Sequence, residues 1–138
     1  MVKVIVGLKG SGKTKRLVEL VSKAVEEEHG NVVCIEKERN LTYDIPHKAR
    51  LIHAGEYDIG SFDFMKGFIS GLFAGDYDIS HIFIDNFHKM FNASTEDQVT
   101  EFLDWLKKFS ATANVRFTVT MTADPALLGE GIRKYILE

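Results

Sequence analysis

The chain has 138 residues, with 17 Lys or Arg, 20 Asp or Glu, one cysteine and two prolines. This length is typical of one domain, and a single cysteine excludes an internal disulfide or a multi-cysteine zinc site. The formal net charge of −3 excludes a broad basic surface, so we expect no nucleic-acid partner. The apolar runs are too short to cross a bilayer and no signal peptide is visible, which predicts a cytoplasmic protein without a membrane partner.

Apolar and β-branched runs predict the strands. The first covers Val2 to Val6 and is nearly continuous, as expected for a strand buried on both faces. Further strands are predicted at residues 32–35, 50–54, 81–84 and 116–121, with a short final strand at 135–137.

Helical spacing of apolar residues predicts a helix from Lys13 to about Glu28, with Gly30 as a left-handed cap. A second long helix is expected to start at Ser94, and Pro125 opens a short helical turn.

Between these lies a predicted helix at residues 62–74, capped by Ser61 and closed by Gly75. Gly67 and Gly71 weaken this helix and sit four residues apart, so we expect them to allow close packing against a neighbouring element.

Strands that alternate with helices predict an α/β fold. The expected architecture is a three-layer α/β/α sandwich, with a mostly parallel central sheet of five or six strands. The whole chain, residues 1–138, is expected to form this single domain.

One segment fits the pattern G-x-x-x-x-G-K-[ST] and lies between a predicted strand and a predicted helix; it reads Gly7-Leu8-Lys9-Gly10-Ser11-Gly12-Lys13-Thr14. Glycines let successive amides turn toward phosphate oxygens, and the helix start adds free donors. Lys13 supplies a positive charge for the phosphates, and the Thr14 hydroxyl can ligate Mg²⁺. We expect phosphate contacts from residues 7–14 and from Lys15.

Asp85 ends the apolar strand of residues 81–84, which predicts a carboxylate in the crevice where ligands bind in open α/β sheets. We expect it to hold the metal together with Thr14. His81 and His88 flank Asp85, but no Cys/His cluster has zinc spacing, so a transition-metal site is not indicated.

With these two motifs the chain resembles the P-loop NTPase superfamily. The strand predicted at 116–121, after Asp85, resembles the division with an additional strand between the loop strand and the acidic strand. RecA-like ATPases and thymidine-kinase-like enzymes belong to that division. The resemblance implies ATP and Mg²⁺ as ligands. The sequence lacks an Asn-Lys-x-Asp motif, which disfavours a GTPase.

Candidates for the hydrolytic step are less clearly marked. Many members of that division carry Glu directly after the acidic Asp, whereas this chain has Asn86, which can orient water but is not a base. Glu36 ends the strand after the first helix, where RecA-like enzymes place their glutamate, and is the expected water-activating residue. Thr120 and Thr122 are candidate sensors of the γ-phosphate, and Thr122 is nearer the carboxyl end of its strand.

Three functions remain open from the sequence. The leading one is a Mg²⁺-dependent ATP-binding protein that hydrolyses ATP slowly or when a partner stimulates it. The others are a small-molecule kinase acting on a nucleoside, and a non-catalytic module whose affinity for a protein depends on bound ATP. The aromatics of residues 62–73 and 83–91 are more typical of a core than of a base-stacking platform. An alternative is that some are exposed and form a patch for self-association or a protein partner, with Phe87, Met90, Phe91, Phe62, Phe64 and Phe68 as the candidates.

Overall fold

The computed structural model describes residues 1–91 and 94–137 and shows an α/β fold around a five-stranded sheet. The strand order is β1-β5-β4-β2-β3, and every pairing is parallel. The strands are β1 (Val2–Gly7), β2 (Asn31–Glu36), β3 (Arg50–His53), β4 (Ile79–Ile84) and β5 (Arg116–Thr122).

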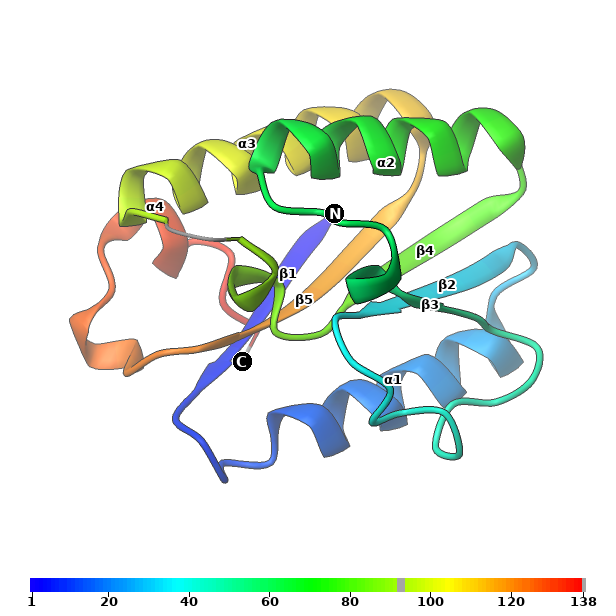
Figure 1. Ribbon diagram of the computed structural model, residues 1–138, viewed down its shortest axis with the longest axis horizontal. Helices are drawn as coiled ribbons and strands as arrows, with labels where there is room; N and C mark the ends of the chain where they lie inside the picture. Colours follow the sequence, from blue (N-terminus) through cyan, green and yellow to red (C-terminus); the bar gives the residue numbers. More distant parts are fainter. Residues whose placement is uncertain (92–93, 138) are drawn as a thin grey trace.

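Helices cover both faces of the sheet, an arrangement compatible with the expected three layers (Figure 1). One face is covered by α1 (Lys13–Glu27) and the other by α2 (Phe62–Gly75) and α3 (Glu96–Ala113). The short elements are η1 (Ala54–Glu56), η2 (Phe87–Met90), η3 (Pro125–Leu127) and α4 (Glu130–Arg133). None of the helices described is long and apolar enough to span a bilayer.

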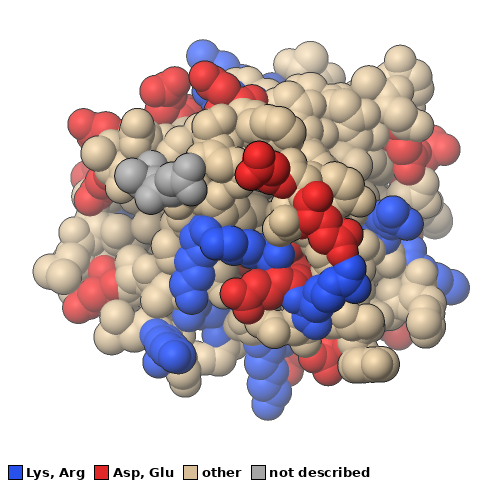
Figure 2. All heavy atoms as spheres, in the orientation of Figure 1, with Lys and Arg blue, Asp and Glu red and all other residues tan. Residues whose placement is uncertain are grey.

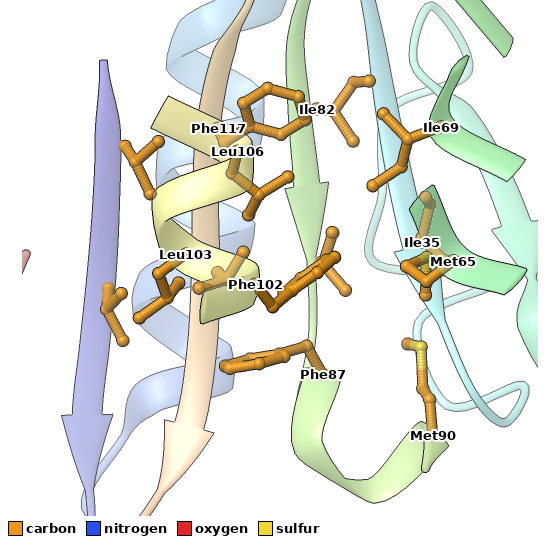
Figure 3. Packing of buried hydrophobic residues seen from close by; sticks show 14 of the residues in the cluster. Ile35, Met65, Ile69, Ile82, Phe87, Met90, Phe102, Leu103, Leu106 and Phe117 are labelled. Atoms are coloured by element: carbon orange, nitrogen blue, oxygen red, sulfur yellow. The ribbon is translucent and has the colours of Figure 1, made fainter. Parts of the chain in front are cut away.

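Each face of the sheet has its own hydrophobic core. On the α1 face, Leu17 and Val21 pack against Cys34 and Phe83, all fully buried. On the other face, α2 and α3 pack against the remaining strand residues; Phe87 lies beside Phe102, and Phe117 lies farther along the sheet near Leu106 (Figure 3). Strand residues alternate between the two cores, because successive side chains point to opposite faces.

The position of β5 is the feature that most affects the site. β5 lies between β1 and β4, the position that the family resemblance implied for the strand after Asp85. Since all strands are parallel, their carboxyl ends meet at one edge of the sheet. Gly7, Glu36, Thr122 and the residues after β4 therefore lie along that edge.

Three boundary predictions were wrong. α1 ends at Glu27 with Glu28 as an extended C-cap, so Gly30 is not a left-handed cap. α3 is capped by Thr95 rather than Ser94, because the Thr95 hydroxyl and the Gln98 side chain form a reciprocal capping box. The last expected strand is reduced to one bridge between Val4 and Ile136.

Two packing predictions also need correction. Phe87, Met90 and Phe91 are buried rather than exposed, since η2 folds onto α3. Only Phe64 of that expected patch is strongly exposed, at 49%. A Cβ built on Gly67 would meet nothing within 4 Å, and Gly71 is equally open, so no described element packs closely there.

Candidate functional site

The glycine-rich loop (residues 7–14) connects β1 to α1 through backbone conformations that require glycine. Gly10 and Gly12 have φ angles of 84° and 88°, in the left-handed region that glycine adopts without strain. The Ser11 amide donates to the Leu8 carbonyl at 3.1 Å and closes the turn. A Cβ on Gly7 would collide with the Ser11 Oγ, so a side chain there would require the Ser11 side chain to move.

The amino end of α1 has no side-chain cap. Its N-cap residue is Gly12, and its first turn contains no acidic residue. By contrast, Ser61 caps α2, Thr95 caps α3, and both of those helices carry acidic residues in the first turn. The first amides of α1 therefore retain free hydrogen-bonding capacity, and the positive end of its dipole is not neutralised by an acid of its own first turn.

Lys13 is buried, with 8% exposure, although lysine is normally a surface residue. Its Nζ donates to the Leu8 carbonyl oxygen at 3.3 Å, so the side chain folds back over the glycine-rich loop. Lys9 and Lys15 are exposed. The side chain of Lys13 thus places an ammonium group beside the loop amides.

Asp85 is the centre of a hydrogen-bond cluster at the carboxyl edge. Its Oδ1 accepts from Thr120 Oγ1 at 2.7 Å and from Thr14 Oγ1 at 3.4 Å. Its amide donates to the Ile35 carbonyl at 2.9 Å and so aligns the residue with β2. The carboxylate is 8% exposed. The structure therefore brings together the two residues expected to hold a metal, Thr14 and Asp85.

Asn86 is held in place by β5. Its φ of 47° is left-handed, a conformation that asparagine tolerates better than most residues. Its amide donates to Thr120 Oγ1 at 2.7 Å, and its side-chain oxygen accepts from Thr122 Oγ1 at 3.1 Å. Thr120 thus fixes both Asp85 and Asn86, a positioning role that alternation of threonines along a strand does not reveal.

Glu36 lies at the same edge but is engaged by the chain that follows it. Its carboxylate is 2% exposed and accepts from the Asn40 amide at 2.9 Å and the Leu41 amide at 3.1 Å, while His53 Nδ1 lies 3.5 Å away. Burial raises the pKa of Glu36, and the hydrogen bonds from Leu41 and Asn40 oppose that effect. Both carboxylate oxygens therefore hold the loop after β2.

His88, in η2, has an environment that the sequence did not indicate. Its Nδ1 is a buried polar atom with no hydrogen-bond partner among the described residues. Burial lowers the pKa of His88, and the positive charges of Lys89 and Lys13 lower it further. The imidazole is therefore neutral near pH 7 and lies within electrostatic reach of Lys13. No set of three or more His, Cys, Asp or Glu side chains suited to a metal occurs in the described part of the chain.

A comparison with family models and with curated proteins finds no match to this chain. The features of this chain that bear on function are the glycine-rich loop, Lys13, Thr14, Asp85 and the residues that hold them. Figure 2 shows basic and acidic side chains interleaved at the centre of the viewed face.

Proposed function

We propose that this chain is a Mg²⁺-dependent ATP-binding protein of the P-loop NTPase type, in which hydrolysis is slow or stimulated by a partner. One observation carries the proposal: the Thr14 hydroxyl at the start of α1 and the Asp85 carboxylate at the end of β4 converge, with Oγ1 and Oδ1 3.4 Å apart. Lys13 and the uncapped amides of α1 lie beside them. The choice of ATP rests on the family resemblance.

The donor set suits a triphosphate with its metal. Hydroxyl and carboxylate oxygens are the ligands that Mg²⁺ prefers, and a metal held between Thr14 and Asp85 would neutralise charge on the phosphates. Lys13 would leave the Leu8 carbonyl, its only hydrogen-bond acceptor among the described residues, and bind a phosphate oxygen. The amides of residues 12–14 would bind further phosphate oxygens, as free donors at a helix start do. Thr120 would keep the Asp85 carboxylate in position.

ATP binding in Lys13→Ala tests the proposal. Calorimetry with Mg²⁺ should show saturable ATP binding in the unchanged protein and none in Lys13→Ala. Lys108→Ala is the control, because Lys108 is exposed on α3 and is not among the residues expected to bind ATP. Equal ATP affinity in Lys13→Ala and the unchanged protein would refute the assignment.

A second function is favoured by the state of the two residues expected to act on water. Asn86 accepts a hydrogen bond from Thr122, and both Glu36 oxygens accept from the loop after β2. If neither Glu36 nor Asn86 acts on water, bound ATP would persist, and the chain would act as a module whose partner affinity depends on nucleotide. Turnover no faster than in Lys13→Ala, with ATP binding intact, would support this function over hydrolysis.

The role of Glu36 as the water-activating residue stays a prediction, and Glu36→Gln separates it from loop anchoring. If Glu36 activates water, the variant binds ATP normally and loses turnover. If Glu36 only anchors the loop, the variant is less stable but turns over ATP at the original rate.

A further inference from the structure

A cavity of about 950 Å³ lies at the amino-terminal edge of the sheet, at the opposite end of the strands from the glycine-rich loop. Its walls come from the last turns of α1, the first residues of β1 and β5, the start of β4, and the turn between α3 and β5. Side chains of Lys3, Lys23 and Arg116 line it, together with His81 and Thr118. None of the residues proposed to bind ATP lines this cavity.

The floor of the cavity is a fixed chain of hydrogen bonds. His81 Nδ1 lies 2.9 Å from Glu28 Oε2, and His81 Nε2 lies 2.8 Å from Thr118 Oγ1. Ser80 Oγ donates to the other Glu28 oxygen at 2.9 Å. Burial raises the pKa of Glu28, but hydrogen bonds from His81 and Ser80 outweigh it and the net pKa is lowered, so this carboxylate only accepts.

The protonation state of His81 follows from these bonds. Because the Glu28 carboxylate accepts, Nδ1 of His81 carries the hydrogen. Burial lowers the pKa of His81, so the ring is neutral, Nε2 accepts, and the Thr118 hydroxyl donates to it. The polar groups of His81, Glu28 and Thr118 therefore form hydrogen bonds with one another in the floor of the cavity. Recognition of a ligand is left to the other side chains of the lining.

The side chains left for recognition are mainly cations. Within residues 1–91 and 94–137, neither Lys3 nor Lys23 takes part in an ion pair, and Arg116 Nη1 is 3.9 Å from Glu28 Oε2, a long contact. Lys3 of β1 pairs with Thr118 of β5, and both side chains lie on the α1 face of the sheet. The Lys3 side chain therefore starts next to the hydrogen-bonded floor of the cavity. Glu27 is the one lining carboxylate outside the Glu28 network.

Lys3 and Arg116 also lie close enough to act on the same group. Burial lowers the pKa of the Met1 amino group, and the charges of Arg116 and Lys3 lower it further. Arg116 has only the long contact to Glu28, and Lys3 has no ion pair among the described residues, so an anion held between them would stabilise both cations.

The rest of the lining is apolar and comes from Leu20, Ala24, Val115 and Leu137. The cavity is far larger than one oxyanion needs and lies within the range of about 300–1,000 Å³ common for small-molecule sites. We propose that this cavity binds a small phosphorylated metabolite, with its phosphate group between Lys3, Lys23 and Arg116 and its organic part on the apolar wall. The proposal is independent of ATP binding.

Titration of the Lys13→Ala protein with inorganic phosphate tests this site, because that change removes the principal phosphate ligand of the glycine-rich loop. Amide shifts in an NMR titration should saturate and cluster at Ser80, Arg116 and Thr118. Adding Arg116→Gln or Lys23→Gln should weaken phosphate binding about tenfold each, the loss expected for one charge-assisted hydrogen bond. Both residues are exposed, so their replacement should leave the fold intact.

Lys108→Gln, on the exposed part of α3, is the control for a general charge effect and should leave phosphate affinity unchanged. Succinate should bind more weakly than phosphate. Unsaturable shifts, shifts confined to residues 8–14, equal losses in all the charge variants, or tighter binding of succinate would each overturn the proposal.

Discussion

Replacing Thr120 with valine tests the cluster around Asp85 directly. Valine has nearly the shape of threonine but no hydroxyl, and Thr120 is fully buried, so no water replaces the lost group. The hydroxyl donates to Asp85 Oδ1 at 2.7 Å and accepts from the Asn86 amide at 2.7 Å. The change therefore removes one hydrogen bond to an ionised acceptor and leaves one amide without its acceptor.

The expected loss of stability can be added up from these two bonds. A hydrogen bond to a charged group contributes about 2 kcal/mol and a neutral one about 1 kcal/mol, so Thr120→Val should lower the free energy of unfolding by about 3 kcal/mol. With a urea dependence of about 2 kcal/mol per molar, the unfolding midpoint should fall by about 1.5 M. The affinity for ATP in the presence of Mg²⁺ should also fall, because the Asp85 carboxylate is no longer held toward Thr14.

Thr118→Val is the matched control. Thr118 is two residues earlier on the same face of β5, is 3% exposed, and donates to His81 Nε2 at 2.8 Å. Its loss breaks one neutral bond, so the unfolding free energy should fall by only about 1 kcal/mol. ATP affinity should not change. Equal stability losses in the two variants, or equal losses of ATP affinity, would show that Thr120 does not hold a metal-binding carboxylate.

Two further predictions concern the fold. Gly67→Ala should raise the free energy of unfolding by about 1 kcal/mol in thermal unfolding, because the new Cβ meets nothing and alanine favours helix. Gly30→Ala should lower it, since that Cβ would lie 2.5 Å from the Asp78 carbonyl oxygen; a stabilised Gly30→Ala would contradict this packing. The pKa values of His81 and His88 are both lowered, mainly by burial, from the ordinary 6.5. Between the folded values and 6.5 the unfolded chain binds more protons, so stability should fall as pH drops below about 6.5, less steeply in His88→Gln. An unchanged slope in that variant would refute the role of His88.

Much of the fold follows from local sequence patterns. The glycine pattern of residues 7–14, the apolar runs of the strands and the Ser61 cap are short-range signals, and each marks the element that the structure shows. The start of α3 was placed one residue early, because Ser94 and Thr95 are both good caps. The reciprocal bond with Gln98, three residues after Thr95, decides between them.

Burial of aromatic residues was harder to foresee. The run after Asp85 contains Phe87, Met90 and Phe91, and the sequence alone left open whether this segment lies in the core or forms an exposed patch. The structure buries all three, because η2 turns the chain back against Phe102 of α3. Such burial depends on where a distant helix lies, and periodicity within one segment carries no information about that.

The sequence by itself determined the glycine-rich loop with Lys13 and Thr14, because its conformation and donors depend on residues within one turn of the chain. It also marked Asp85, whose strand is unmistakably apolar. Only the tertiary structure decided that Thr120 holds Asp85 and Asn86, that Glu36 is engaged by the loop after β2, and that His81 joins Glu28 to Thr118. These contacts join residues that lie from 5 to 53 positions apart in the chain. Most of these contacts depend on which strands lie side by side in the sheet, and no local sequence pattern determines that.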